Sequence, residues 1–164
     1  MDDLFASQRP AQIAVTDGIR QLTGFADTAS LQSGLDEVLS ISPWRQQQTP
    51  GGRTIRVRIT NCGDYGWVSD ARGYRYEATD PVTGAPWPAL PEAWVQLAVR
   101  AASTAGCPDY RPNACLINRY EVGDSMGSHQ DKNERDFRQP VVTVSLGLPA
   151  EFLIYGDTRG GTPA

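Results

Sequence analysis

The sequence predicts an α+β protein or a β-sandwich backed by helices. Two segments with helical periodicity, 28–40 and 91–105, precede a C-terminal third that is rich in β-branched and aromatic residues. Strands crowded at one end of a chain, with helices grouped before them, are typical of these two fold classes. A length of 164 residues corresponds to one domain, large enough to bury a core.

The first predicted helix begins after Asp27 or Thr28, either of which can cap it, and carries an apolar stripe at helical spacing: Leu31, Leu35, Val38 and Leu39. The second begins at Pro91, a residue favoured at the first helical position, and stops at Gly106. We expect both helices to support the core rather than to bind a cofactor. Residues 1–26 are expected to form a loosely built lead-in.

The clearest predicted strand is 53–60, which follows a turn at 50–52. Its apolar residues, Ile55, Val57 and Ile59, alternate with Arg56 and Arg58, so one face is apolar and the other is cationic. Further strands are predicted over 115–121, 141–147 and 152–155, with a turn at Gly123-Asp124.

Composition excludes several classes of protein. His129 is the only histidine, so no site in these residues can use two imidazoles. Three widely spaced cysteines without a CxxC pair favour reduced thiols over a zinc ribbon or a disulfide framework. No apolar run approaches the roughly 18 residues that span a bilayer, and the N-terminus is acidic. We therefore expect a cytoplasmic protein that does not contact membranes.

Charge is unevenly distributed along the chain. The net charge is −4, yet residues 44–76 contain six arginines and two acidic residues, which makes this segment +4 and the remainder −8. A basic stripe on an acidic body indicates either a phosphate-contacting face or a solvated arginine-bearing strand. Aromatic residues follow on glycine-punctuated loops (Tyr65, Trp67, Tyr74 and Tyr76). They suit stacking on nucleobases or covering the edge of a small core.

One motif carries metal chemistry, His129-Gln130-Asp131. On a strand, residues two apart share a face, so the imidazole and the carboxylate would point the same way. These are two of the three ligands of the 2-His-1-carboxylate triad that holds non-haem Fe(II). By itself, a His-x-Asp spacing can also occur by chance in a protein that has no metal site.

Upstream, Leu116, Asn118 and Tyr120 would share one strand face. The amide and the phenol are hydrogen-bond donors that fit a small carboxylate ligand beside the metal. The alternative is that they satisfy a buried polar network.

Several short segments, taken together and in order, resemble the AlkB family of Fe(II)- and 2-oxoglutarate-dependent dioxygenases, most closely its bacterial members. These segments are 49–52, 60–63, 66–67, 73–76, 86–88, 118–120, 123–124, 129–134 and 144–149. The resemblance runs from the N-terminus to about Arg159. It implies a double-stranded β-helix (jelly roll) with supporting N-terminal helices and a β nucleotide-recognition lid. The single dioxygenase domain, 1–164, would comprise an N-terminal extension and helix (1–44), the lid (45–90) and a helix with the first part of the core (91–164).

The resemblance also implies a set of site residues. His129 and Asp131 would be catalytic and would bind Fe(II). Residues at the 2-oxoglutarate site would be Leu116, Asn118, Arg119 and Tyr120. Trp67 would stack on a flipped, damaged base, and further substrate contacts would come from Thr49, Tyr74, Arg75, Tyr76, Asn133 and Arg159. Asn133 departs from the family pattern, which has an aspartate there, and this affects the preference for cationic lesions.

The function implied is oxidative dealkylation of N-alkylated bases, of the 1-methyladenine or 3-methylcytosine type, in DNA repair. We expect a monomer that binds alkylated DNA, with RNA as an alternative. The family's jelly roll continues with strands that carry a second histidine ligand and an arginine for 2-oxoglutarate. We therefore expect these 164 residues to be a fragment, inactive without those ligands. The rival interpretations are a catalytically dead nucleic-acid-binding fragment and a related dioxygenase acting on proteins or small molecules.

Overall fold

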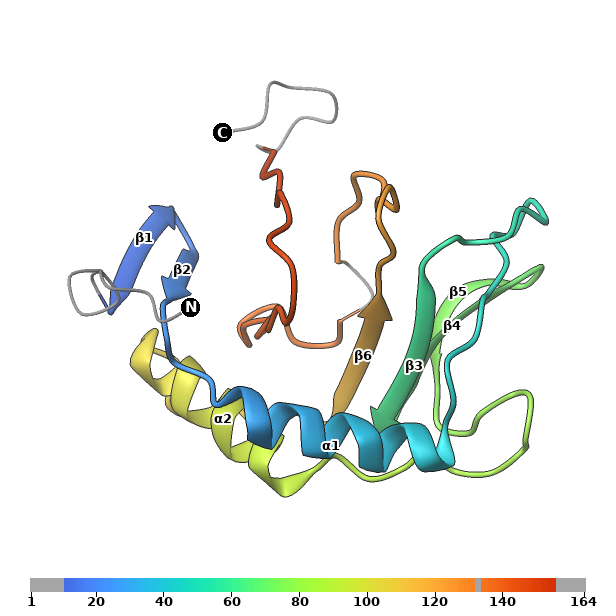
Figure 1. Cartoon of the computed structure of the whole chain (residues 1–164), viewed down its shortest axis with the longest axis horizontal. Helices are drawn as coiled ribbons and strands as arrows, with labels where there is room; N and C mark the ends of the chain where they lie inside the picture. The colour runs from blue at the N-terminus through green and yellow to red at the C-terminus, as the bar shows by residue number, and fades with distance from the viewer. Residues whose placement is uncertain (1–10, 132–133, 156–164) are drawn as a thin grey trace.

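The computed structural model describes residues 11–131 and 134–155. Within these residues it contains two helices and three two-stranded antiparallel sheets, which confirms the mixed α+β class (Figure 1). The elements in chain order are β1 (Gln12–Thr16), β2 (Ile19–Leu22), α1 (Thr28–Ile41), β3 (Arg58–Gly63), β4 (Gly66–Asp70), β5 (Gly73–Glu77), α2 (Glu92–Thr104) and β6 (Ala114–Arg119).

Both predicted helices are present, with nearly the predicted ends. The carboxylate of Asp27 accepts a hydrogen bond from the Ser30 amide at 2.8 Å and so caps α1. The two helices approach closely at Gly34, where a Cβ atom would lie 2.6 Å from Nε1 of Trp94. In the described part of the chain, no helix is long and apolar enough to cross a membrane.

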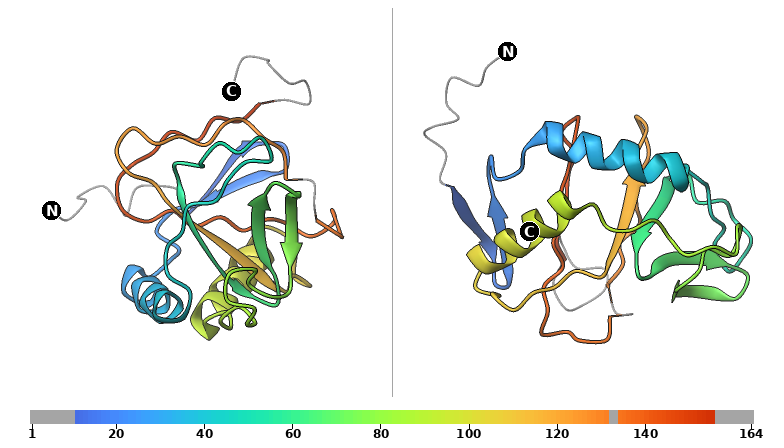
Figure 2. Two further views of the ribbon diagram at one scale, coloured as in Figure 1. Left: turned by 90° about the vertical axis from the view of Figure 1, so that its right-hand side faces the viewer. Right: turned by 90° about the horizontal axis from the view of Figure 1, so that it is seen from below.

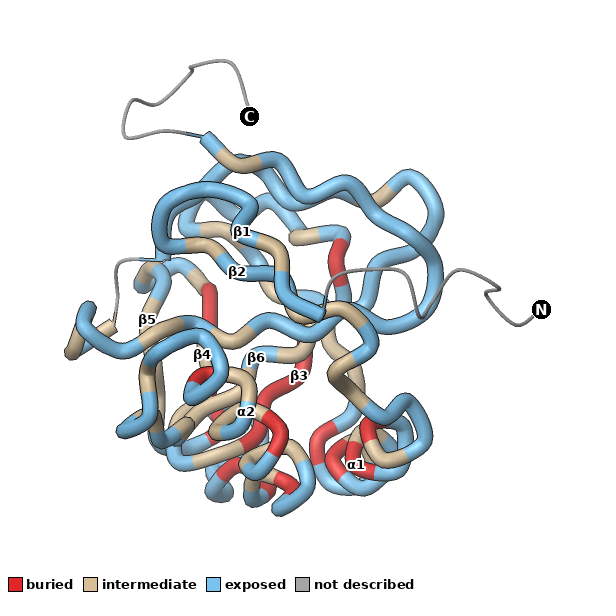
Figure 3. The backbone as a smooth tube through the Cα atoms, turned by 90° about the vertical axis from the view of Figure 1, so that its left-hand side faces the viewer, coloured by how far each residue is buried: buried red, intermediate tan, exposed pale blue. Residues whose placement is uncertain are grey.

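Helices α1 and α2 form one layer, and the β3–β6 ladder lies against it (Figures 1 and 2). It runs in unbroken register from Arg58 opposite Arg119 to Gly63 opposite Ala114. Val57 and Ile59 are 1% and 2% exposed, as their alternation with arginines predicts. Buried residues concentrate in this lower part of the molecule, whereas the loops above it are mostly exposed (Figure 3).

The strand predicted over 53–60 is displaced toward the C-terminus. Residues 53–57 pair locally with the preceding segment: the Ile55 amide donates to the Gln47 carbonyl at 2.8 Å, and Gln48 bridges Thr54. This local pairing replaces a continuous ladder, so the regular strand begins only at Arg58.

The β4–β5 hairpin is anchored through Trp87, whose indole N–H donates to the Glu77 carbonyl at 2.9 Å. The indole lies directly against Gly66, where any Cβ would collide with it. The hairpin is therefore held at the edge of β3, in the part of the chain predicted to be a lid (Figure 2).

The lead-in prediction is wrong for residues 12–22, which form the β1–β2 hairpin. Its turn contains Asp17-Gly18, and Gly18 has φ of 80°. Asp-Gly between two short strands is a strong hairpin signal, because glycine adopts positive φ without strain. That signal was present in the sequence.

The predicted strands 141–147 and 152–155 are not formed either. These segments run as an irregular chain, orange to red in Figure 1, and much of their apolar surface is open: Val141 is 63% exposed and Phe152 is 78% exposed. A strand needs a neighbour to satisfy its backbone groups, and these segments have none among the described residues.

Candidate active site

His129 and Asp131 lie together in an irregular loop after β6, not on a strand. His129 Nε2 is 3.7 Å from Asp131 Oδ1, and both side chains are more than half exposed. His129 Nδ1 donates to the Gly127 carbonyl at 2.8 Å. In a neutral ring with its proton on Nδ1, Nε2 is the nitrogen that can coordinate a metal, and it faces the Asp131 carboxylate. The two side chains are brought together by the loop and not by a pleated strand.

The strand face predicted to bind a carboxylate is formed on β6 by Leu116 and Asn118, whereas Tyr120 follows the last residue of the strand. Oδ1 of Asn118 is buried and has no hydrogen-bond partner among the described residues. Burial raises the pKa of Tyr120 further above neutrality. Leu116 lies on the same side of the pleat as Asn118. Arg119 faces the other way and pairs with Glu121 at 2.8 Å, so the structure does not bring it to this face.

Two lid aromatics form a stacked pair. The Trp67 and Tyr74 ring centroids are 5.6 Å apart with an interplanar angle of 18°. The backbone of Trp67 is held by buried Asn61: Trp67 N–H donates to Oδ1 and Nδ2 donates to the Trp67 carbonyl, each at 3.0 Å. Tyr74 is half exposed, so the pair presents aromatic surface at the outer side of the hairpin.

The β4–β5 hairpin also contacts the loop that carries His129 and Asp131. The Tyr76 phenol donates to Glu134 at 3.0 Å. Its pKa is raised by burial, by that hydrogen bond and by the charges of Glu134 and Asp131. The structure therefore brings Tyr76 to the same site as Asp131.

Two further contacts join the same parts of the chain. The Arg135 guanidinium lies 5.9 Å from the ring centroid of Tyr65, and Arg56 pairs with Asp124 at 3.2 Å. Sequence reasoning assigned no role to Glu134, Asn61 or these contacts. No local pattern marks them, because each depends on residues far apart in the chain.

Most of the basic stripe is neutralised by ion pairs. Arg75, predicted to contact substrate, is held by Asp70 at 2.9 Å and by Glu77. The ion-paired arginines of the stripe are Arg45, Arg56, Arg72 and Arg75. Arg53 and Arg58 are exposed and form no ion pair within the described part of the chain. The cationic surface available to phosphate is therefore smaller than the sequence predicts.

The remaining predicted site residues are placed as follows. The Thr49 hydroxyl accepts a hydrogen bond from the Arg53 amide at 3.1 Å and so closes the turn at 50–52. Asn133 and Arg159 lie outside the described residues.

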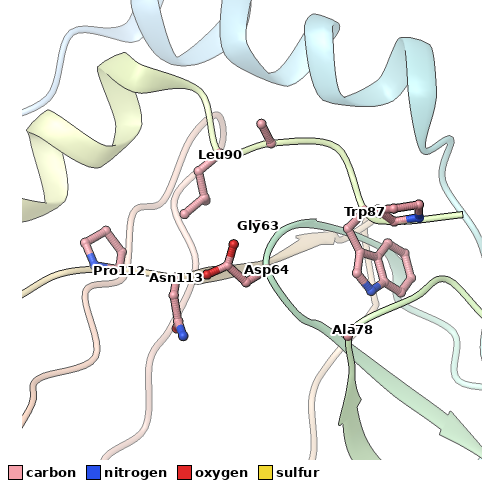
Figure 4. A pocket seen from close by; sticks show the side chains of 9 residues that line it. Gly63, Asp64, Ala78, Trp87, Leu90, Pro112 and Asn113 are labelled. Atoms are coloured by element: carbon pink, nitrogen blue, oxygen red, sulfur yellow. The ribbon is translucent and has the colours of Figure 1, made fainter.

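A separate cavity of about 440 Å³ lies at the other end of the β3–β6 ladder (Figure 4). It is lined by Gly63, Asp64, Trp87, Leu90, Pro112 and Asn113, among others. Asn113 is five residues before Asn118 on an extended chain, which corresponds to roughly 15 Å. None of the residues that line the cavity is a predicted site residue.

The residues present fit an Fe(II) and 2-oxoglutarate site in part. An imidazole nitrogen and a carboxylate are the donor types of the facial triad, and the phenol of Tyr120 can donate to a carboxylate. The unpartnered Oδ1 of Asn118 can only accept, so a carboxylate would be bound by the Nδ2 donor of the same amide. In the described residues no group of three potential metal ligands occurs, so a third protein ligand is not among them.

Comparison with known proteins identifies the family. A profile described as the 2OG-Fe(II) oxygenase superfamily matches residues 18–164. The chain is 49% identical over 161 residues to the alpha-ketoglutarate-dependent dioxygenase AlkB of Escherichia coli K12, an alignment that covers 97% of this chain and 74% of that protein. It is 48% identical to AlkB of Salmonella typhimurium, over 99% of this chain and 76% of the relative.

A more distant plant relative also aligns over nearly the whole chain. This is the DNA N(6)-methyladenine demethylase ALKBH1A of Arabidopsis thaliana, 37% identical over 99% of this chain and 44% of the relative. The chain therefore belongs to the AlkB family of Fe(II)- and 2-oxoglutarate-dependent dioxygenases.

Proposed function

We propose that this protein repairs DNA by removing alkyl groups from base nitrogens, with lesions of the 1-methyladenine or 3-methylcytosine type as substrates. The observation that carries the proposal is the 49% identity to E. coli AlkB over 97% of the chain. The chemistry that Fe(II) and 2-oxoglutarate supply when bound is oxidation of the alkyl carbon by O₂, with succinate, CO₂ and an aldehyde as products. The fold we propose is the family's double-stranded β-helix, with residues 45–90 as its lid and 91–164 in its core.

His129 and Asp131 are the proposed iron ligands. The hydrogen bond from Nδ1 to Gly127 holds the imidazole in the tautomer whose Nε2 can coordinate a metal. Since His129 is the only histidine of the sequence, these residues supply two ligands of a triad that needs three. We therefore expect the 164 residues alone to hold Fe(II) weakly and to turn over slowly or not at all.

Asn118 and Tyr120 are the proposed 2-oxoglutarate contacts, with Leu116 on the wall of that site. The phenol would donate to a carboxylate oxygen, and Nδ2 of Asn118 would donate a second hydrogen bond. Arg119 is less well supported as a 2-oxoglutarate contact, because it pairs with Glu121 on the other face of the strand.

The lid is the proposed substrate-binding element. Trp67 would stack on a base flipped out of the duplex. Flipping a base costs a few kcal/mol, and less when the lesion cannot pair. Tyr74, already stacked on Trp67, would move with it or extend the aromatic surface. Thr49, Arg75, Tyr76, Asn133 and Arg159 stay as proposed substrate contacts. The structure has the first three engaged in contacts of their own.

The metal assignment is tested by anaerobic titration of Fe(II) in the presence of 2-oxoglutarate, followed by absorption spectroscopy. His129→Ala and Asp131→Ala should each abolish the spectral change. Asp136→Ala is the matched control, because Asp136 is an acidic residue of the same loop that pairs with Arg138. Wild-type binding by either ligand variant would refute the assignment.

The substrate class is tested by binding of oligonucleotides with and without a single 1-methyladenine, compared with methylated peptides. The proposal expects preferential binding of the methylated oligonucleotide, weakened by Trp67→Ala while the Fe(II) titration is unchanged. DNA binding without any Fe(II) site would favour a nucleic-acid-binding protein that lacks the chemistry. Preference for peptides or small metabolites would favour a different dioxygenase.

A further inference from the structure

Two cysteines face each other across the β3–β6 ladder. Cys62 of β3 is directly opposite Cys115 of β6 in the antiparallel register. Cys62 is completely buried and Cys115 is partly buried, and both are free thiols. They lie on the face of the ladder opposite to Asn118, since Cys115 and Asn118 are three residues apart on a pleated strand.

The hydrogen bonds at the edge of β3 that faces away from β6 define the geometry of the Cys62–Cys115 pair. Both the N–H and the C=O of Ile59 bond to Arg45, so Ile59 is turned away from β6. Backbone groups alternate along an antiparallel strand, which makes Cys62 and Cys115 a hydrogen-bonded pair. The Cα atoms of such pairs are about 5.5 Å apart, within the range of natural disulfides.

We propose that Cys62 and Cys115 form a redox-active dithiol, which low-molecular-weight disulfides such as glutathione disulfide oxidise to a cross-strand disulfide. The site is independent of the proposed repair activity, because neither thiol belongs to the metal or substrate residues. The third cysteine, Cys107, lies outside the ladder and is replaced by serine in the test.

The surroundings assign different roles to the two thiols. A hydrogen bond from Cys62 lowers the pKa of Cys115, although burial opposes this. The pKa of Cys62 is raised by its hydrogen bond to Cys115, by burial and by the charge of the Cys115 thiolate. Cys115, the more accessible and more acidic thiol, is therefore the attacking nucleophile and Cys62 is the resolving thiol.

The reaction balances in two exchange steps. The Cys115 thiolate attacks one sulfur of the oxidant, which forms a mixed disulfide and releases the first glutathione thiolate. Loss of the negative charge on Cys115 removes one cause of the raised pKa of Cys62. Cys62 then gives up its proton and attacks Sγ of Cys115, which releases the second glutathione. The protein loses two electrons and two protons, and the oxidant becomes two thiols.

The new bond would close a loop that contains the β4–β5 hairpin and α2. Cross-linking residues that enclose a segment of this length restricts the unfolded chain. The oxidised protein should therefore melt at a higher temperature than the reduced protein, and proteolysis within the lid should slow.

The experiment uses the folded protein in the Cys107→Ser background, in which the only thiols are Cys62 and Cys115. Samples are incubated with glutathione disulfide in excess over glutathione, quenched with acid, and analysed by intact mass and non-reducing peptide mapping. The expected result is a protein lighter by two hydrogens and a linked peptide pair containing Cys62 and Cys115. Little or no glutathione adduct should accumulate.

Two variants separate the roles of the thiols. Cys62→Ser in this background should accumulate a stable glutathione adduct on Cys115, because the resolving thiol is gone. Cys115→Ser should leave Cys62 unmodified while the protein is folded, and a sample unfolded in urea shows that Cys62 can react. A persistent adduct on Cys115 with Cys62 present, or a dithiol that stays reduced, would overturn the proposal. If Cys62→Ser fails to fold, the Cys107→Ser protein still decides between these outcomes, when its native sample is compared with a sample unfolded in urea.

Discussion

The Tyr76 phenol donates a hydrogen bond to the Glu134 carboxylate at 3.0 Å, across 58 residues of sequence. This contact ties the lid strand β5 to the loop that carries His129 and Asp131. A phenol has one proton to donate, so Tyr76 cannot donate to a DNA phosphate while it is bound to Glu134. If Tyr76 contacts phosphate, as the resemblance implies, the lid must first release Glu134.

The first prediction concerns stability at high pH. The pKa of Tyr76 is raised in the folded protein by burial and by the hydrogen bond and charge of Glu134. Above the ordinary tyrosine pKa of about 10, the unfolded chain loses this proton before the folded one does, so the free energy of unfolding falls as pH rises. Tyr76→Phe should make that fall shallower, measured by urea unfolding at pH 8 to 11.

Glu134→Gln is the matched control, because it keeps an acceptor for the phenol but removes the charge. The pKa of Tyr76 should then move toward its ordinary value, and the fall should again be shallower than in the wild type. An alkaline profile identical in all three proteins would show that the Tyr76–Glu134 contact is not formed in solution.

Local signals predicted much of the fold. Asp27, Pro91 and Gly106 mark helix ends because capping and backbone conformation act within a few residues. The alternation of Val57 and Ile59 with arginines correctly predicted a buried face. The strands predicted over 141–147 and 152–155 are absent because a strand depends on a pairing partner elsewhere in the chain, which local composition does not reveal.

The candidate site was predictable only as a set of residue types. The sequence indicated that His129 and Asp131 belong together, but the strand invoked for them is absent, and the Gly127 carbonyl orients the imidazole instead. The ion pairs that neutralise Arg45 and Arg56 involve Asp80 and Asp124, which are distant in sequence. Net charge along a segment could not predict which arginines remain free.

The second prediction concerns Asn61, which is almost completely buried and holds the Trp67 backbone by two hydrogen bonds. Asn61→Ala removes the side-chain acceptor of the Trp67 N–H, whereas the Trp67 carbonyl keeps its hydrogen bond from Gln47 Nε2 at 3.2 Å. The substitution should lower the free energy of unfolding by about 1–2 kcal/mol. Trp67 fluorescence should also change. Gln32→Ala, which removes an exposed hydrogen bond within α1, should change stability by less than about 0.5 kcal/mol. Similar effects of the two substitutions would contradict this role for Asn61.

The third prediction concerns the Arg45–Asp80 ion pair, with a separation of 2.6 Å. Burial would raise the pKa of Asp80, but hydrogen bonds from Arg45, the Val82 amide and Thr83 outweigh it and lower the pKa. This stabilisation is present above the ordinary aspartate pKa of about 4 and is lost as pH falls through the lowered value. Arg45→Met should lower the free energy of unfolding by roughly 2 kcal/mol at pH 7. This is less than for a fully buried ion pair, because Arg45 is partly exposed.

Urea unfolding at a series of pH values from 7 to 2.5 measures this effect. The difference between the wild type and Arg45→Met should shrink as Asp80 becomes protonated. A difference that stays constant over this range would mean that Arg45 acts through packing of its apolar stem.

The fourth prediction concerns the contact between the helices. Any side chain at Gly34 would press on the Trp94 ring, so Gly34→Ala should destabilise the protein by about 1–3 kcal/mol despite the higher helix propensity of alanine. Gly127→Ala is the control, because its Cβ would enter open space. Thermal unfolding followed by circular dichroism compares the two. A stabilising Gly34→Ala would show that the helices lie farther apart.

The last prediction rests on the proposed binding of DNA and separates free arginines from paired ones. Each phosphate neutralised by a cationic side chain steepens the dependence of log K on log salt by about 0.9. Arg53 and Arg58 are exposed and form no ion pair within the described residues, so they can contact phosphate without losing an existing partner. Arg53→Gln and Arg58→Gln should each reduce the slope by about one and weaken binding equally for methylated and unmethylated oligonucleotides.

Arg72→Gln is the comparison, because Arg72 lies on the same lid but is paired with Asp70 at 3.3 Å. Binding a phosphate there would compete with a carboxylate, so the slope should change less than for Arg53 or Arg58. Fluorescence anisotropy at several salt concentrations measures all three slopes. If Arg72→Gln reduced the slope most, DNA would bind at the tip of the hairpin and displace its ion pairs, and the segment 53–58 would not be the phosphate-binding face.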